Sequence, residues 1–171
     1  FQRFESVHAS DAAADALHQL GDILLMDGAP SDAAEAYGRA IGIAYRLGET
    51  WRLPALLANR GVTSVALMHV GEAVTDLEDA AKLARALGDG GNELFALERL
   101  ASLDTSLGVY GRAATRYEAA EEVARGMGDL ERELALRVER GNVLSELGVL
   151  SDAIVVLEGV VEEARDIESP A

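Results

Sequence analysis

The sequence has no cysteine, three prolines, one lysine and only 5% aromatic residues. Without cysteine, the chain cannot form a disulfide framework, a thiolate zinc site or a cysteine nucleophile. Its 171 residues are still enough to bury a substantial core, so stability needs neither a disulfide nor a metal. It also lacks a signal-peptide pattern and any run of about 18 uncharged apolar residues that would span a membrane. We therefore expect a cytoplasmic protein that does not enter the membrane.

Positive charge is scarce as well. There are 15 basic residues against 30 acidic ones, which gives a formal net charge of −15. A surface that binds phosphate groups needs Lys and Arg side chains to displace counterions. We therefore expect no direct nucleic-acid partner. The abundant alanine, leucine and glutamate residues are strong helix formers and favour an all-helical protein.

The residues that carry chemistry form no recognisable constellation. No two of the three histidines, His8, His18 and His69, have the spacing of a metal-binding pair on a helix. The glycine-rich stretch of residues 88–92 lacks the Lys-Ser/Thr of a phosphate-binding loop, and no Gly-x-Ser-x-Gly motif occurs. We predict no catalytic residue, no metal site and no cofactor, so the protein is not expected to be an enzyme.

Residues of the same kind recur every 40 positions. The recurring columns are Ala33, Ala73, Ala113 and Ala153; Ala44, Ala84, Ala124 and Ala164; Tyr37, Leu77, Tyr117 and Leu157; and Gly21, Gly61, Ala101 and Gly141. The period divides the chain into repeats at residues 10–49, 50–89, 90–129 and 130–168, followed by a tail at 169–171. In the same alignment, residues 1–9 match the end of a preceding repeat. We therefore expect a separate tail helix there, left from a repeat that was cut from a longer protein.

Each repeat is predicted to form two antiparallel helices. In the last repeat, residues 134–147 carry apolar side chains three or four positions apart, and Gly148 supplies a helix stop. The dipeptide Ser151-Asp152 offers an N-cap for the following helix. Pro30 and Pro54 are expected in the first turns of their helices, where a missing N–H costs little.

The columns also predict how the helices pack. Glycine or alanine on the first helix is expected to face the column of Ala33 on the second, because only small side chains allow two helices to approach closely. The column of Tyr37 is expected to fill the space between successive hairpins. Because one hairpin cannot bury its apolar face alone, the hairpins are expected to stack into an α-solenoid.

These columns resemble the tetratricopeptide repeat in its longer variant of about 40 residues. The resemblance rests on the Leu20-Gly21 pair and on the alanine–aromatic–alanine trio of Ala33, Tyr37 and Ala40, both of which recur in modified form. It implies an all-α, right-handed α-solenoid of four helix hairpins that binds a protein or peptide without catalysis. The Leu-Gly-Asp repeat ends resemble those of large bacterial signalling and transcription regulators, which implies a fragment of such a regulatory protein.

Three charged residues depart from the family pattern. Arg60, Asp104 and Arg140 stand where the family usually has apolar or aromatic residues. A buried charge is costly unless it is paired. One interpretation is that these side chains lie near helix edges and pair locally, and the other is that they form a polar seam between hairpins.

A tetratricopeptide array usually lines its concave groove with first-helix residues, and the resemblance places a partner-binding groove here. The candidate groove residues are Leu25, Met26, Ala55, Ala58, Val62, Val65, Ala66, Phe95, Glu98 and Asn142. The contribution of the second repeat is wholly apolar, which is typical of a surface that takes the apolar stripe of a partner helix. Since the chain itself is acidic, we expect a protein or peptide segment that is apolar at its centre and basic at its flanks.

Three alternatives remain open at this stage. The chain is also consistent with a ligand-sensing regulatory domain of a transcription regulator, which would bind a small peptide or metabolite. It is equally consistent with a homo-oligomerisation module that uses the apolar groove or an unfinished terminal hairpin. Finally, the small groove residues would also suit a surface that binds nothing and merely permits tight packing.

Overall fold

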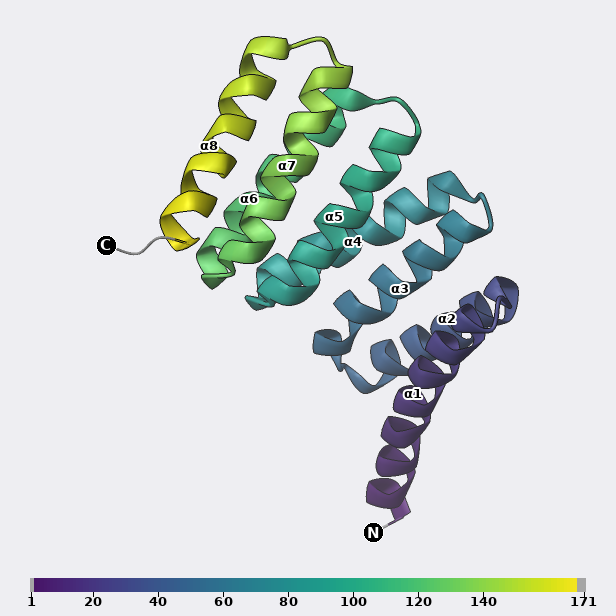
Figure 1. Cartoon of the computed structure of the whole chain (residues 1–171). Coiled ribbons are helices and arrows are strands. Elements are labelled where there is room, and N and C mark those ends of the chain that lie inside the picture. The colour runs from purple at the N-terminus through teal and green to yellow at the C-terminus, as the bar shows by residue number, and fades with distance from the viewer. Residues whose placement is uncertain (1, 169–171) are drawn as a thin grey trace. The chain divides into compact units, whose positions relative to one another are not determined.

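The computed structural model describes residues 2–168, with side chains from residue 11 to residue 165. Within this range the chain forms eight α-helices and one short 3-10 helix, and it contains no strand. The elements are α1 (Gln2–Met26), α2 (Pro30–Leu47), η1 (Thr50–Arg52), α3 (Leu53–Ala66), α4 (Val70–Leu87), α5 (Gly90–Ser106), α6 (Tyr110–Met127), α7 (Leu130–Glu146) and α8 (Leu150–Glu168). Figure 1 shows them as successive helices joined by tight turns. The prediction of an all-α fold built from helix hairpins is confirmed.

The helix ends follow from the glycines and prolines of the sequence. Gly48 adopts the left-handed conformation with φ of 72° after α2, and the N–H of the next residue, Glu49, donates to the Ala44 carbonyl oxygen at 2.9 Å. The ends of the next two repeats, Leu87-Gly88-Asp89 and Met127-Gly128-Asp129, terminate α4 and α6 in the same way. Pro30 and Pro54 lie in the first turns of α2 and α3, as predicted.

The capping of the last helix differs from the prediction. Helix α8 already begins at Leu150, so Ser151 and Asp152 lie in its first turn rather than before it. A side-chain cap is found instead on α7, where the carboxylate of Asp129 accepts from the backbone N–H of Arg132 at 3.0 Å. The aspartate that follows the terminating glycine can therefore start the next helix.

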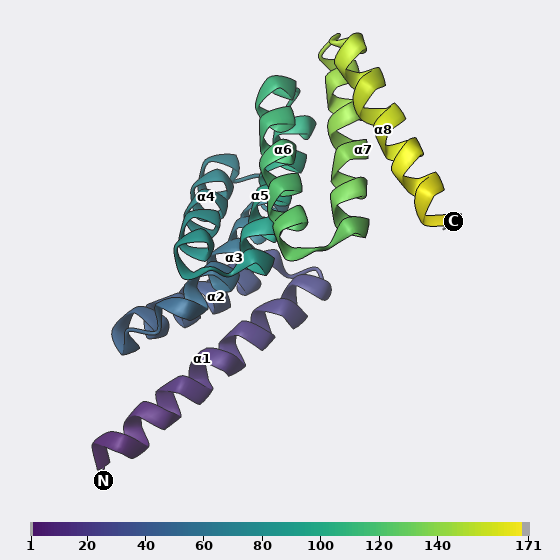
Figure 2. The same ribbon diagram turned by 90° about the vertical axis from the view of Figure 1, so that its left-hand side faces the viewer.

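The described residues form two compact units, which meet at Ala96 and Leu97 inside α5. In the first unit α1 packs against α2, α2 against α3, and α3 against α4. In the second unit α7 packs against both α6 and α8, and Figure 2 shows α7 and α8 as neighbouring antiparallel helices. Both units are thus built from the same hairpin.

The glycine column packs differently from the expectation. A Cβ atom added to Gly21, Gly61 or Gly141 would collide first with the large residue of the same hairpin. The closest approaches are 2.5 Å between Gly21 and Tyr37, 2.8 Å between Gly61 and Leu77, and 2.7 Å between Gly141 and Leu157. The large side chain therefore lies over the glycine of its own hairpin. The comparison of repeats did not predict this contact, because a recurrence of residues does not say which helix each one faces.

The N-terminal helix also differs from the expectation. Residues 2–9 belong to α1, which continues without a break from Gln2 to Met26. There is thus no separate tail helix before the first repeat. No glycine or proline interrupts the helical sequence at this point, so the chain has no local reason to turn.

Candidate interaction surface on the first helices

The ten candidate groove residues divide between the two compact units. Eight lie in the first unit, on α1, α3 and the beginning of α5, while Glu98 and Asn142 lie in the second. Within the first unit, Met26 is 88% exposed and Ala66 is also exposed. The side chains of intermediate exposure are Leu25, Ala55, Val62, Val65 and Phe95. The first unit therefore presents accessible apolar side chains on its first helices.

Ala58 does not belong to this surface. It is completely buried, so its side chain is not accessible to a partner. The next residue, Asn59, reaches toward α1 instead, and its amide donates to Asp22 Oδ1 at 3.2 Å and lies 3.0 Å from His18 Nε2. Sequence reasoning missed Asn59, although a polar residue beside an apolar helical face was a signal for such a contact.

A polar cluster joins α1, α2 and α3 beside the apolar residues. The Tyr37 hydroxyl donates to Asp22 Oδ1 at 2.7 Å, and the His18 ring lies edge-on to the Tyr37 ring at a centroid distance of 6.0 Å. Burial of the ring, together with the hydrogen bond to Asp22, raises the pKa of Tyr37. The neutral tyrosine therefore remains a donor that ties the second helix to the first.

An arginine joins the start of the second repeat to the first. The Arg52 guanidinium donates to Asp11 and Asp15 on α1, and its Nε donates to Glu49 at 2.7 Å. The guanidinium carbon also lies 4.3 Å from the centroid of the Trp51 ring. These contacts raise the pKa of Arg52, chiefly through the hydrogen bond to Asp15. The cluster fixes η1 against the first helix of the surface.

The second unit has a small charged pocket at the corresponding place. It has a volume of about 310 Å³ and lies between α5, α6 and α7, with Tyr117 among its lining residues. Glu98 lines this pocket, but its carboxylate already accepts from the Arg132 guanidinium. Burial raises the pKa of Tyr117, an effect that a hydrogen bond with Thr105 partly offsets. Asn142, the other candidate of this unit, is exposed on α7.

The three charged residues that depart from the family pattern are all paired. Arg60 forms a bidentate salt bridge with Asp76 inside the α3–α4 hairpin, with N–O distances of 2.6 and 2.7 Å. Asp104 is completely buried and accepts from two arginines of the following helix α6, Arg112 and Arg116. These two residues support the interpretation of local pairing.

Arg140 supports the other interpretation, because its partner lies on the preceding hairpin. Its Nε donates to Glu121 Oε1 at 2.7 Å and its Nη2 donates to Oε2 at 3.0 Å, which joins α7 to α6. Burial raises the pKa of Glu121, although the contact with Arg140 opposes this effect. A polar link between hairpins therefore exists at this position of the second unit.

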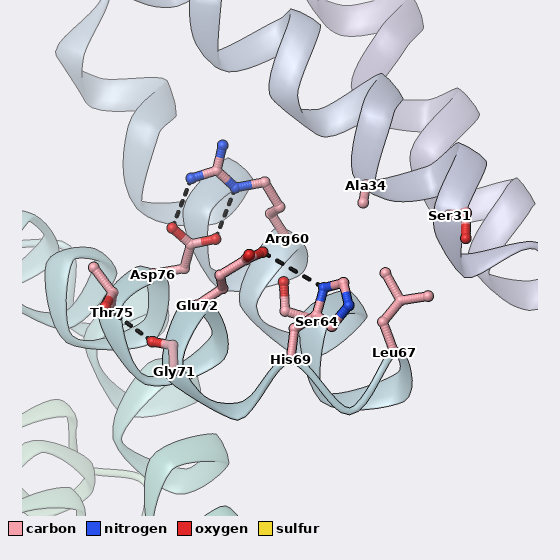
Figure 3. A pocket seen from close by; sticks show the side chains of 10 residues that line it. All are labelled: Ser31, Ala34, Arg60, Ser64, Leu67, His69, Gly71, Glu72, Thr75 and Asp76. Atoms are coloured by element: carbon pink, nitrogen blue, oxygen red, sulfur yellow. Dashed lines mark hydrogen bonds and ion pairs between the residues drawn. The ribbon is translucent and has the colours of Figure 1, made fainter.

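A pocket of the first unit lies away from the candidate groove, between α2, α3 and α4. It has a volume of about 750 Å³, and Figure 3 shows the paired Arg60 and Asp76 on one side of it and Leu67 on another. His69 and Glu72 lie 3.6 Å apart at its edge. Across the side chains of residues 11–165, no group of three or more histidine and carboxylate residues is placed to hold a metal ion. None of the helices within residues 2–168 is long and apolar enough to cross a membrane.

Comparison with known proteins finds solved structures that share this fold. No family model and no curated protein sequence matches the chain. Among solved structures, BtubC (BKLC) from P. vanneervenii matches 95% of this chain and 67% of its own, with a TM-score of 0.82 and 15% identity. A putative kinesin light chain from Podosopora anserina with TPR-like repeats matches 92% and 76%, with a TM-score of 0.74 and 19% identity. The MamA protein matches 99% and 84%, with a TM-score of 0.70 and 17% identity.

The chain has a tetratricopeptide-like fold. At identities of 15–19% the likeness establishes the fold and not the activity or the partners.

Proposed function

We propose that this tetratricopeptide-like chain is a non-catalytic scaffold that binds a protein or peptide segment on the first helices of residues 11–96. The observation that supports the proposal most directly is the set of accessible apolar side chains on α1 and α3, with Met26 88% exposed. Large apolar side chains grouped at the surface are typical of an interaction site. In this proposal the chain is part of a larger bacterial regulatory protein.

The charge of the chain suggests the character of the partner. Carboxylates such as Asp22 and Asp27 are exposed on and beside α1, and the formal net charge of the chain is −15. A partner helix would bury its apolar stripe against Val62 and Met26 and place basic residues near these carboxylates. The preferred segment is therefore apolar at its centre and basic at its flanks.

The alternative of a ligand-sensing domain would place its ligand in the pocket of about 310 Å³ in the second unit. There Glu98 is already satisfied by Arg132. A small ligand would have to compete with this ion pair, whereas the apolar side chains of the first unit gain by being covered. This difference favours the scaffold over the sensor.

The test uses two synthetic amphipathic 18-residue peptides with the same apolar stripe, one with lysine flanks and one with glutamate flanks. Met26→Gln and Val62→Gln should each weaken binding of the lysine-flanked peptide by roughly fivefold, because each removes part of an apolar contact worth about 1 kcal/mol. Met68→Gln is the matched control, since Met68 is 80% exposed in the turn after α3 and outside the proposed surface. Fluorescence anisotropy gives the affinities.

The expected result is binding of the lysine-flanked peptide alone, reduced by Met26→Gln and Val62→Gln and unchanged by Met68→Gln. Equal binding of the two peptides would contradict the predicted charge preference. Failure of both peptides to bind, or an equal loss in the control variant, would contradict the proposed surface.

A further inference from the structure

The pocket between α2, α3 and α4 owes part of its space to one short side chain. Ser64 of α3 lines this pocket, whose volume is about 750 Å³. The residues at the same register position in the other repeats are larger, namely Leu24, Asp104 and Leu144. The second repeat therefore leaves room at a position that the other repeats occupy with a longer side chain.

The hydroxyl of Ser64 is a polar group that the fold does not use. The residue is only 3% exposed. Within the described residues its hydroxyl has no hydrogen-bond partner, and Figure 3 marks no interaction between Ser64 and the other lining residues. Because no fully buried side-chain oxygen or nitrogen of the described residues lacks a partner, the Ser64 oxygen is accessible from the pocket. A ligand that bonds this hydroxyl would satisfy a polar group that is otherwise nearly withdrawn from water.

Carboxylates outnumber cations around this hydroxyl. The guanidinium of Arg60 is held by Asp76 in the bidentate salt bridge described above. The carboxylate of Glu72 is largely exposed, and its nearest ionisable neighbour is His69, with 3.6 Å between Oε2 and Nδ1. With the histidine counted as neutral, the lining residues carry one excess negative charge. The pocket therefore suits a cation, whereas an anion would meet two carboxylates.

The third repeat shows which cation fits this register position. There Asp104 accepts from the guanidinium groups of Arg112 and Arg116. The second repeat has carboxylates, Glu72 and Asp76, at the positions of these two arginines. No arginine of α4 can therefore reach Ser64 as the arginines of α6 reach Asp104. A guanidinium from outside the chain would bond the serine hydroxyl and a carboxylate at once, because its planar fork carries five N–H donors.

Apolar side chains beside the pocket suit the neighbours of such an arginine in a peptide. Leu67 lines the pocket, and the next residue, Met68, is 80% exposed in the turn between α3 and α4. Met68 has a φ of 61°, at the turn position where the other repeats have the positive-φ glycines Gly28, Gly108 and Gly148. A long side chain is uncommon in this conformation, and here it packs into no core. Leu67 and Met68 thus offer an accessible apolar contact next to the acidic pocket.

We propose that this pocket binds an arginine side chain of a peptide segment, with the guanidinium between the Ser64 hydroxyl and the Glu72 carboxylate. Apolar residues on either side of the arginine would cover Leu67 and Met68. The stem of the arginine is itself apolar and would lie along the pocket wall. The site uses neither Met26 nor Val62, so it is independent of the first-helix surface proposed above.

The test compares three probes on the full chain. The first is a blocked tripeptide with arginine between two leucines, the second has citrulline in place of the arginine, and the third is propylguanidine. Citrulline keeps the shape of arginine without its charge. Proton–nitrogen NMR titrations give the affinities and locate the binding through the shifts of Ser64, Leu67 and Gly71. The arginine peptide should bind about tenfold more tightly than the citrulline peptide, because only a charged guanidinium forms charge-assisted hydrogen bonds. It should also bind more tightly than propylguanidine, which lacks the apolar neighbours.

Variants of the lining residues test the assignment. Glu72→Gln should weaken binding of the arginine peptide about threefold, as expected for an exposed ion pair. Ser64→Leu should abolish it, because it fills the space with the residue that the first and fourth repeats carry. Ser64→Ala removes only the hydroxyl and should weaken binding about fivefold. It keeps the test decisive if circular dichroism shows that the leucine variant does not fold. Asp79→Asn is the matched control, since Asp79 is an exposed carboxylate of the same helix outside the pocket.

Two methionines separate this site from the first-helix surface. Met68→Gln should weaken the arginine peptide about twofold and leave the lysine-flanked peptide unchanged, whereas Met26→Gln should have the opposite effects. Either proposal can therefore fail without the other. Equal binding of the citrulline peptide would overturn the choice of a cation, and equal affinity for propylguanidine would overturn the choice of a peptide. Absence of shifts around the pocket, or a loss in Asp79→Asn equal to that in Glu72→Gln, would overturn the site itself.

Discussion

The same substitution, glycine to alanine, should have opposite effects at two helical positions of the first unit. Gly61 lies in the interior of α3 and Gly38 in the interior of α2. At Gly61 an added Cβ would lie 2.8 Å from Cγ of Leu77 and 3.3 Å from the carbonyl oxygen of Ala73. At Gly38 it would meet nothing within 4 Å. The pair therefore separates the intrinsic preference of the helix from the packing of the hairpin.

The magnitudes can be compared directly. Each substitution should add up to about 1 kcal/mol to the free energy of unfolding through helix propensity, because alanine is more favourable than glycine in a helix interior. At Gly61 the new carbon would lie well inside the optimal carbon–carbon separation of about 3.5–4.0 Å. Leu77 is completely buried, so the overpacking cost should fall at the upper end of the usual range of about 1–3 kcal/mol. We expect Gly38→Ala to be stabilised by up to about 1 kcal/mol and Gly61→Ala to be destabilised by about 1–2 kcal/mol.

Urea unfolding followed by circular dichroism gives the free energies of unfolding. A third variant, Leu77→Ala, should cost about 2–5 kcal/mol alone, because it leaves a cavity in the core. Combined with Gly61→Ala it should cost less than the sum of the two changes, since the alanine methyl group then occupies part of the space that the leucine left. Equal stability of Gly61→Ala and Gly38→Ala would refute the close packing of Leu77 over Gly61, and so would strict additivity in the double variant.

Two further predictions concern buried polar groups. Asp104→Asn should destabilise the second unit by about 3 kcal/mol, because it removes the charge that holds the largely buried guanidinium of Arg116. Glu118→Gln, on the exposed side of α6, should cost less than about 1 kcal/mol in the same urea assay. Equal costs would contradict the difference in burial between the two ion pairs. Because burial and Asp22 raise the pKa of Tyr37 in the folded state, the stability that this tyrosine contributes is complete below the unfolded pKa of about 10 and is lost as pH rises toward the folded value. Stability measured from about pH 9 to 11 should therefore fall less steeply in Tyr37→Phe than in the unmodified chain, and identical slopes would show that Tyr37 does not titrate abnormally.

The sequence is informative about the helices because their limits depend on local chemistry. The left-handed glycine after α2 at Gly48 and the prolines Pro30 and Pro54 act within one turn of their own position, so they could be placed without knowledge of the fold. The separate N-terminal helix was wrong for a related reason. It rested on the repeat alignment alone, and no glycine or proline near residue 9 supported it.

The candidate surface was harder to predict, because accessibility depends on neighbouring helices. Ala58 and Val62 are one turn apart on α3, and both are apolar, yet only Ala58 is completely buried. A helical period places both on one side of the helix but does not show how closely α1 approaches it. The polar residue beside them, Asn59, marked that approach, and its contacts with His18 and Asp22 became evident only when the two helices were placed together.

The ion pairs of Arg60 and Arg140, which share one register position, follow a rule that can be stated in sequence terms once the geometry is known. Arg60 pairs with Asp76, sixteen residues later in its own hairpin, and Arg140 pairs with Glu121, nineteen residues earlier in the preceding one. In each case the other of these two positions carries an apolar residue. The arginine at this register position therefore pairs with a later or an earlier residue, according to which of the two positions carries a carboxylate. Where neither position is acidic, as for Leu100, an apolar residue replaces the arginine. The partner lies within the same hairpin for Arg60 and on the preceding hairpin for Arg140. A comparison between repeats therefore identified the small columns but left the partners of these charged residues undecided.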